Sequence, residues 1–86
     1  MINEIEDKYN QAVVKWLVEN DKTDVSEHII DIITSALLTR NKIKEGGGFV
    51  QALVKNDLKG AIGRADSQVL DNLALIVKAY NNIDIF

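Results

Sequence analysis

The chain has 86 residues, a formal net charge of −3 and 47% hydrophobic residues. A chain of this length can form one domain but not two, so we expect residues 1–86 to fold as a single helical domain. The absence of cysteine excludes disulfide bonds and metal sites built from thiolates.

A first helix is predicted at about residues 3–20, where apolar side chains recur at helical spacing. Its two aromatic residues, Tyr9 and Trp16, share the apolar face and are expected in the core, while Tyr9 could instead stack on a base or face a partner. The polar stretch at 20–24 breaks the pattern and predicts a loop.

A second helix is predicted at about residues 25–42. Asp24 and Glu27 have the spacing of a capping box, with Thr23 and Ser26 as competing caps. Apolar residues cover most of the circumference, which indicates a central helix or a subunit interface. The β-branched run at 29–33 could form a strand, but the length and cap of the segment favour a helix.

The third helix is predicted to begin near Gly48 or Phe49, after three consecutive glycines. Asn56 and Asp57 indicate a turn, and Asp57 can cap a short helix through residue 62. Asp66 is expected to cap the last helix, at about residues 67–82. The expected architecture is therefore all-α, a compact bundle of four to five short antiparallel helices.

The apolar content is high for so short a chain, and oligomerisation often buries such an excess. The tail at 83–86 is also unusually apolar, so we expect it to dock on its own core or on a neighbouring subunit. The bundle is therefore expected to be oligomeric, with an interface formed by Ile32, Leu38, Ile85 and Phe86.

Charges are segregated along the chain, with −5 over residues 1–31, +4 over 32–64 and −2 over 65–86. Such a segregation of charge can indicate a charged binding partner, although an ordinary solvated surface explains it equally well. The N-terminus is acidic and has no signal-peptide pattern, and no apolar run could span a membrane, so we expect a cytoplasmic protein.

The glycine triplet and its basic surroundings are the first candidate site, because free N–H groups at a helix start can bind phosphate. The alternative is a flexible turn that lets Phe49 reach the core. Neither a Walker loop nor a dinucleotide fingerprint is present. The candidate ligand-binding residues, placed around the triplet and the following turns, are Lys44, Gly46, Gly47, Gly48, Asn56, Asp57 and Arg64.

Arg64 has two interpretations at its corner. It could form an ion pair with the capping carboxylate of Asp66, or face a bound phosphate or a partner carboxylate. His28 is the only histidine and lacks a partner for a metal site or a nucleophile–base pair. We therefore expect no enzyme activity, no metal and no cofactor. Residues 49–64 could form a helix-turn-helix, but the acidic balance makes nucleic acid an unfavoured partner.

Residues 46–82 resemble a group of small phage and prophage accessory proteins with a GGF-x-x-A-x-x-x-NDL-x-x-A-x-x-RAD pattern. The matching segments here are Gly47 to Leu58 and Ala61 to Asp66, followed by an apolar helix that ends in Tyr80-Asn81. This resemblance implies a viral protein that blunts a bacterial defence by binding.

Three hypotheses follow from these patterns. The first is a non-enzymatic inhibitor that binds a host defence protein in the bacterial cytoplasm. The second is an oligomeric sponge that sequesters a phosphorylated or nucleotide-derived immune signal at the glycine-rich loop. The third is a self-assembling structural protein.

Overall fold

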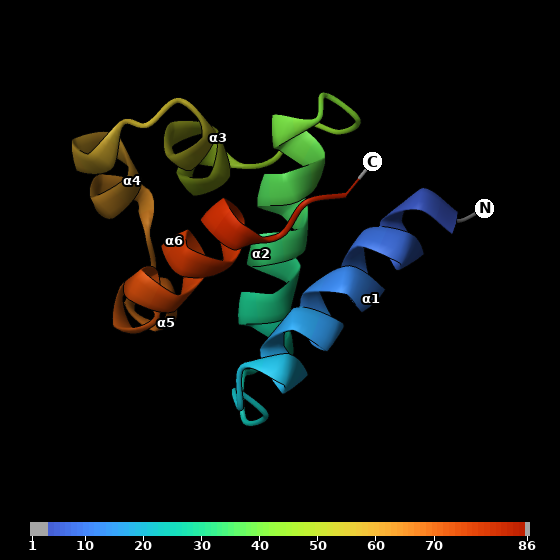
Figure 1. The fold of residues 1–86 in the computed structure, drawn as a ribbon. Helices are drawn as coiled ribbons and strands as arrows, with labels where there is room; N and C mark the ends of the chain where they lie inside the picture. The colour runs from blue at the N-terminus through green and yellow to red at the C-terminus, as the bar shows by residue number, and fades with distance from the viewer. Residues whose placement is uncertain (1–3, 86) are drawn as a thin grey trace.

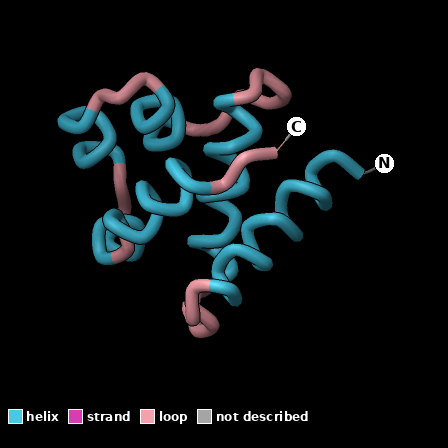
Figure 2. The backbone as a smooth tube through the Cα atoms, in the orientation of Figure 1, coloured by secondary structure: helices cyan, strands magenta, loops and turns pink. Residues whose placement is uncertain are grey.

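The computed structural model describes residues 4–85, and this part of the chain is all-helical, with turns and no strand between its helices (Figures 1 and 2). Its extents are 32 × 28 × 21 Å. The helices are α1 (Glu4–Glu19), α2 (Glu27–Arg40), α3 (Gly48–Val54), α4 (Leu58–Arg64), α5 (Ser67–Asp71) and α6 (Leu73–Asn82). The predicted helical class is confirmed, whereas the expected number of four to five helices is wrong.

The additional helix arises because the segment predicted as one helix at 67–82 is divided at Asn72. The backbone of Asn72 leaves the helical conformation (φ −117°, ψ 16°), and its side-chain amide donates to the carbonyl of Gln68 at 2.9 Å. Asparagine side chains compete for backbone partners in this way and so interrupt helices. The short α5 therefore turns into α6 at this residue.

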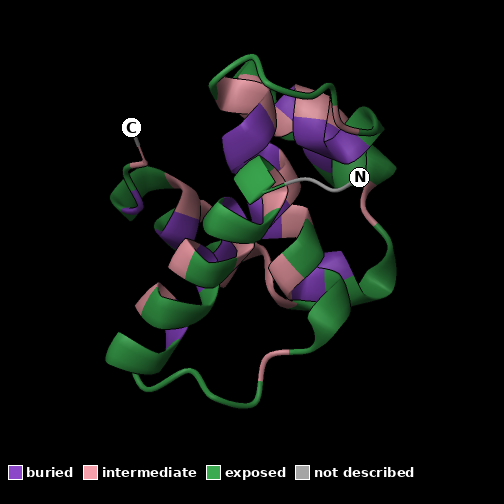
Figure 3. Ribbon diagram, turned by 90° about the vertical axis from the view of Figure 1, so that its right-hand side faces the viewer, coloured by how far each residue is buried: buried purple, intermediate pink, exposed green. Residues whose placement is uncertain are grey.

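Helix α2 lies at the centre of the fold and contacts α1, α3 and α6 (Figure 1). Its residues Ile29, Ile33 and Leu37 are buried against these neighbours. The prediction of a central helix is thereby confirmed, and the strand alternative for this segment is wrong. Buried positions gather where helices face one another, and exposed positions lie on the outside (Figure 3).

Polar side chains fix the beginnings of three helices. Asp57 accepts a hydrogen bond from the Gly60 N–H at 3.0 Å, and Asp66 accepts one from the Val69 N–H at 2.8 Å. Both predicted aspartate caps are confirmed. At α2 the cap is Ser26 instead of Asp24, and its hydroxyl accepts from the Ile29 N–H at 3.4 Å.

Helices α1, α2 and α3 end in the same motif. A residue other than glycine adopts the left-handed conformation, and the next N–H bonds to the carbonyl five residues earlier. The left-handed residues are Asp21, Lys42 and Asn56, with φ values of 60°, 63° and 62°. The hydrogen bonds run from Lys22 to Leu17, Ile43 to Leu38 and Asp57 to Ala52, at 2.8, 2.9 and 2.8 Å.

Arg40, in the last turn of α2, holds the end of α6. Its guanidinium donates to the carbonyl of Tyr80 at 2.8 Å and to that of Ile83 at 2.9 Å. It also lies 5.1 Å from the centroid of the Tyr80 ring. One arginine thus satisfies carbonyls that lack helical partners at a helix end.

The described part of the tail docks on its own chain. Ile83 is buried, and the carbonyl of Ile85 accepts a hydrogen bond from the Asn41 side chain at 3.2 Å. Phe86, also predicted at an interface, lies outside the described residues.

The two predicted interface residues on α2 pack against their own chain. Ile32 is half-buried against the core. Leu38 is only 2% exposed, which corrects its predicted place at a subunit interface, because the side chain has almost no surface to offer. The helical periodicity identified Leu38 as apolar but could not show that one chain alone covers it.

Candidate functional site

The glycine triplet is a close-packed corner between α2 and α3. An added Cβ at Gly46 would lie 2.6 Å from Val50 Cγ1 and 2.7 Å from Ser35 Oγ, both closer than normal contacts. The triplet contains no left-handed glycine. Glycine is therefore required at position 46 by the closeness of α2 and α3 and not by a left-handed turn.

Hydrogen bonds fix this corner, and one of them occupies an N–H group of the predicted anion site. The N–H of Gly46 donates to Thr39 Oγ1 at 3.0 Å, so it is not available to a ligand. The carbonyl of Gly46 accepts from the Gln51 side chain at 2.7 Å. Gly47 is the N-cap of α3 and is exposed, with no side-chain cap bond. Gly46 is thus a structural residue, contrary to its predicted role as a ligand contact.

Three of the predicted site residues converge on one small cavity of about 170 Å³, which we call the cationic pocket. Its lining residues are Gly48, Gln51, Ala52, Lys55, Asp57 and Arg64. The Arg64 side chain lies against the backbone of Gly48, where an added Cβ would be 2.7 Å from Arg64 Cδ. The pocket therefore brings the start of α3 and the end of α4 together.

The charges in the cationic pocket do not cancel. Two cations, Lys55 and Arg64, face the single carboxylate of Asp57, which already caps α4. Arg64 donates to the Gly60 carbonyl at 3.5 Å, and it forms no ion pair within residues 4–85. An acidic group of a ligand could therefore be held there by charge and hydrogen bonds.

The predicted ion pair between Arg64 and Asp66 is wrong. Asp66 instead contacts the imidazole of His28, with 2.9 Å between Nε2 and Oδ2. The hydrogen bond from Val69 N–H and the contact with His28 lower the pKa of Asp66 below its ordinary value. This exposed pair joins the start of α2 to the start of α5. Arg64 therefore forms no ion pair with Asp66 and lines the cationic pocket instead.

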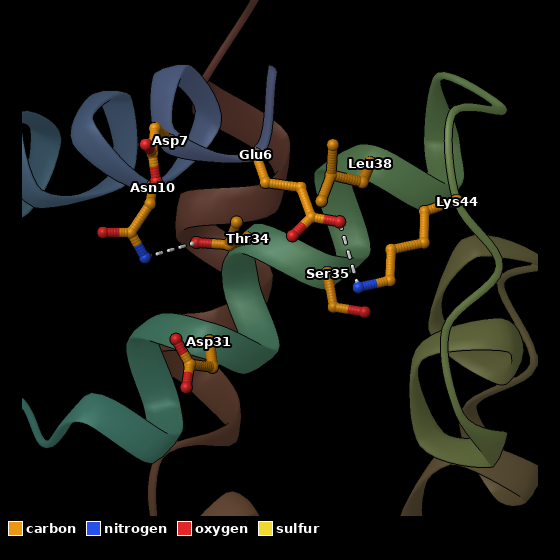
Figure 4. A pocket seen from close by; sticks show the side chains of 8 residues that line it. All are labelled: Glu6, Asp7, Asn10, Asp31, Thr34, Ser35, Leu38 and Lys44. Carbon is orange, nitrogen blue, oxygen red and sulfur yellow. Dashed lines mark hydrogen bonds and ion pairs between the residues drawn. The ribbon is translucent and has the colours of Figure 1, made fainter. Parts of the chain in front are cut away.

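Lys44 does not join Arg64, contrary to its predicted place in one anion site. The left-handed turn at Lys42 directs the following chain toward α1, where Lys44 Nζ lies 3.1 Å from Glu6 Oε2 (Figure 4). The sequence placed Lys44 beside the glycines but could not show this turn.

Lys44 and Glu6 border a polar cleft of about 430 Å³ between α1 and α2 (Figure 4). Within the cleft, Asn10 Nδ2 donates to Thr34 Oγ1 at 3.4 Å, and the Thr34 hydroxyl donates to the Ile30 carbonyl at 2.8 Å. In residues 4–85, no group of three or more potential metal-ligating side chains occurs. The cleft lining is Glu6, Asp7, Asn10, Asp31, Thr34, Ser35, Leu38 and Lys44.

An apolar groove of about 180 Å³ adjoins the cationic pocket at Asp57. It is lined by Leu53, Asn56, Asp57, Leu58, Ala61, Leu73 and Val77. Asn56 therefore belongs to this groove and not to the cationic pocket. Leu58 is 64% exposed, whereas most aliphatic side chains of this size are buried. The groove and the cationic pocket share Asp57 and together form the candidate site.

Sequence reasoning placed no groove here, and it counted Lys55 only among the basic surroundings of the glycines and not among the ligand-binding residues. The signal for Lys55 was present, because Gly48, Ala52 and Lys55 have the spacing of one helix face. The groove had no such signal, since Leu73 and Val77 come from a helix that is distant in sequence.

Comparisons with protein-family models, with curated proteins and with solved structures gave no match to this chain. In addition, no helix within residues 4–85 has the length and apolar character needed to cross a membrane.

Proposed function

We propose that this chain is a small non-enzymatic phage accessory protein that inhibits a bacterial defence system by binding a host protein in the bacterial cytoplasm. The resemblance of residues 46–82 supports the viral context. The apolar groove beside the exposed Leu58 supports the binding role and is the single observation on which it depends. Covering Leu58 and the apolar lining of the groove with a partner side chain would remove apolar surface from water, which favours binding.

The small volumes of the apolar groove and the cationic pocket favour a protein target over a free small molecule. Small-molecule pockets usually enclose about 300–1,000 Å³. The groove and the cationic pocket measure about 180 and 170 Å³ and lie on either side of Asp57. Two separate side chains of a partner fit this arrangement, an aliphatic one in the groove and a carboxylate beside Lys55 and Arg64.

The test is affinity capture from a susceptible bacterial host, followed by mass spectrometry. The wild-type chain is expected to retain a stoichiometric host protein, and the double variant Leu58→Ser with Ile62→Ser is expected to lose it. The matched control, Val14→Ser with Val18→Ser, changes two exposed valines of α1 and should retain the same protein. Recovery of the bait alone, or equal capture by all three chains, would refute the proposal.

A second candidate function is sequestration of a phosphorylated immune signal. The supporting observation is the cationic pocket, which has room for one phosphate group beside Lys55, Arg64 and the backbone of Gly48. Thermal unfolding with a panel of nucleotides and cyclic nucleotides tests it, because a ligand that binds the folded state raises Tm. A rise that is lost in Arg64→Gln supports the candidate, and no rise with any compound excludes it for that panel.

A further inference from the structure

The side chain of Arg64 lies in a space that two glycines leave open. An added Cβ at Gly48, the first residue of α3, would be 2.7 Å from Arg64 Cδ and 3.2 Å from Arg64 Nε. An added Cβ at Gly60, within α4, would be 3.1 Å from Arg64 Nη1. A methyl group at position 48 would therefore displace the arginine, and one at position 60 would crowd its guanidinium. Arg64 thus has a defined place between α3 and α4, which pack against each other.

In this place the guanidinium keeps most of its hydrogen-bonding capacity. An arginine has five N–H donors, arranged as a planar fork. Within residues 4–85, Arg64 donates to the Gly60 carbonyl at 3.5 Å and forms no ion pair. Two parallel donors of such a fork match the two oxygens of a carboxylate or of a phosphate. The arginine is therefore positioned in the cationic pocket with donors open to an acidic group.

The charge of the lining favours one of these two groups. Lys55 and Arg64 oppose Asp57, so the lining has a net charge of +1. Asp57 is held in the lining because its carboxylate accepts the Gly60 N–H at 3.0 Å. A carboxylate carries one negative charge and balances the surplus. A phosphorylated side chain carries about −1.5 to −2 at pH 7 and would bring uncompensated charge close to Asp57.

From these observations we infer that the cationic pocket is a carboxylate site, which binds one aspartate or glutamate side chain at Arg64 and favours it over a phosphate. The source of that side chain rests on the proposed function, since the host protein would supply it. The volume of about 170 Å³ has room for one such group. Arg64 supplies the directed hydrogen bonds, Lys55 adds a point charge, and Gly48 is a positioning residue that leaves room for the arginine.

A titration followed by NMR tests the inference on the purified chain. The probes are glutamate, glutamine and phosphoserine, each acetylated at the amino end and amidated at the carboxyl end, at equal ionic strength. Capped glutamate should shift the signals of Arg64 Nε–H and of the Gly48 amide until they saturate. Capped glutamine has the same shape without the charge and should leave them unchanged. Capped phosphoserine should bind more weakly than capped glutamate.

Three variants separate the fork and its position from charge alone. Arg64→Lys keeps the charge without the fork and should lower the affinity for capped glutamate by about threefold or more. Gly48→Ala keeps both cations of the pocket but displaces the Arg64 side chain, so it should also weaken binding. Lys59→Gln removes a charge from an exposed position of α4 outside the pocket lining and should retain the wild-type affinity. Circular dichroism will verify that all three are folded.

Several results would overturn the inference. The first is the absence of saturable shifts with capped glutamate, or equal shifts with capped glutamine. Tighter binding of capped phosphoserine would also overturn it and would favour a phosphorylated ligand. Wild-type affinity in both Arg64→Lys and Gly48→Ala would show that any cation at this surface suffices. These titrations need no host protein, so a carboxylate site confirmed here would stand even if affinity capture recovered the bait alone.

Discussion

Replacement of Arg40 by alanine should destabilise the fold more than any other change of a charged side chain. Its guanidinium bonds to the Tyr80 and Ile83 carbonyls at 2.8 and 2.9 Å and lies over the Tyr80 ring. A hydrogen bond that involves a charged group contributes about 1.5–3 kcal/mol, and a cation–π contact about 0.5–1 kcal/mol. Because Arg40 is half-buried, we take the lower ends for the two hydrogen bonds and the ring contact, which sum to about 3.5 kcal/mol for Arg40→Ala.

Urea unfolding followed by circular dichroism measures this loss directly. For a domain of this size, about 3.5 kcal/mol corresponds to a decrease in Tm of roughly 14–28 °C. Arg40→Lys retains the charge but cannot reach both carbonyls, so it should recover less than half of the loss. Lys78→Ala, an exposed cation on α6, is the matched control and should change stability by at most about 0.5 kcal/mol. An Arg40→Ala protein as stable as that control would refute the assigned role of the guanidinium.

Four further outcomes are expected. Gly46→Ala should lose about 1–3 kcal/mol in urea unfolding through overpacking, whereas Gly47→Ala, whose added Cβ meets open space, should be neutral or gain up to about 1 kcal/mol. Lys42→Gly should gain about 1 kcal/mol because its left-handed conformation is unfavourable for lysine, and a loss would contradict that conformation. Leu38→Ala should lose about 2–5 kcal/mol at every protein concentration, whereas a concentration-dependent loss would restore its interface role. Asp66→Asn keeps a capping side chain but removes the charge. Since the folded state lowers the pKa of Asp66, its charge stabilises the fold fully above the ordinary value of 3.8, and this contribution is lost as pH falls below 3.8 and through the lower pKa of the folded state. The difference in Tm between the two proteins should therefore shrink below pH 3.8.

Local signals in the sequence were sufficient for most of the helices. The first helix was predicted at 3–20 and is found at Glu4–Glu19, and the second at 25–42 is found at Glu27–Arg40. Asp57 and Asp66 were recognised as caps because a capping residue acts within three residues of its own position. The helix break at Asn72 was missed, since the helical spacing of apolar residues continues across it from Val69 to Leu73 and Ile76.

The candidate site was only partly predictable, because the partner of a long side chain depends on which residues the tertiary structure brings near it. Gly48, Asp57 and Arg64 do meet, as they lie on two successive short helices. Lys44 bonds to Glu6 across a sequence separation that no local pattern reveals. Arg64 and Asp66 are near neighbours in sequence, yet the N-cap geometry of α5 directs the Asp66 carboxylate toward His28.

The central position of α2 has a consequence for synthesis on the ribosome. Its apolar surface is completed by Ile76 and Ala79 of α6, which are translated about forty residues after α2 ends. At about 5–20 residues per second, the nascent chain carries an uncovered α2 for roughly 2–8 s. During that interval α2 cannot complete its core, and the fold closes only when the carbonyls at the end of α6 reach Arg40.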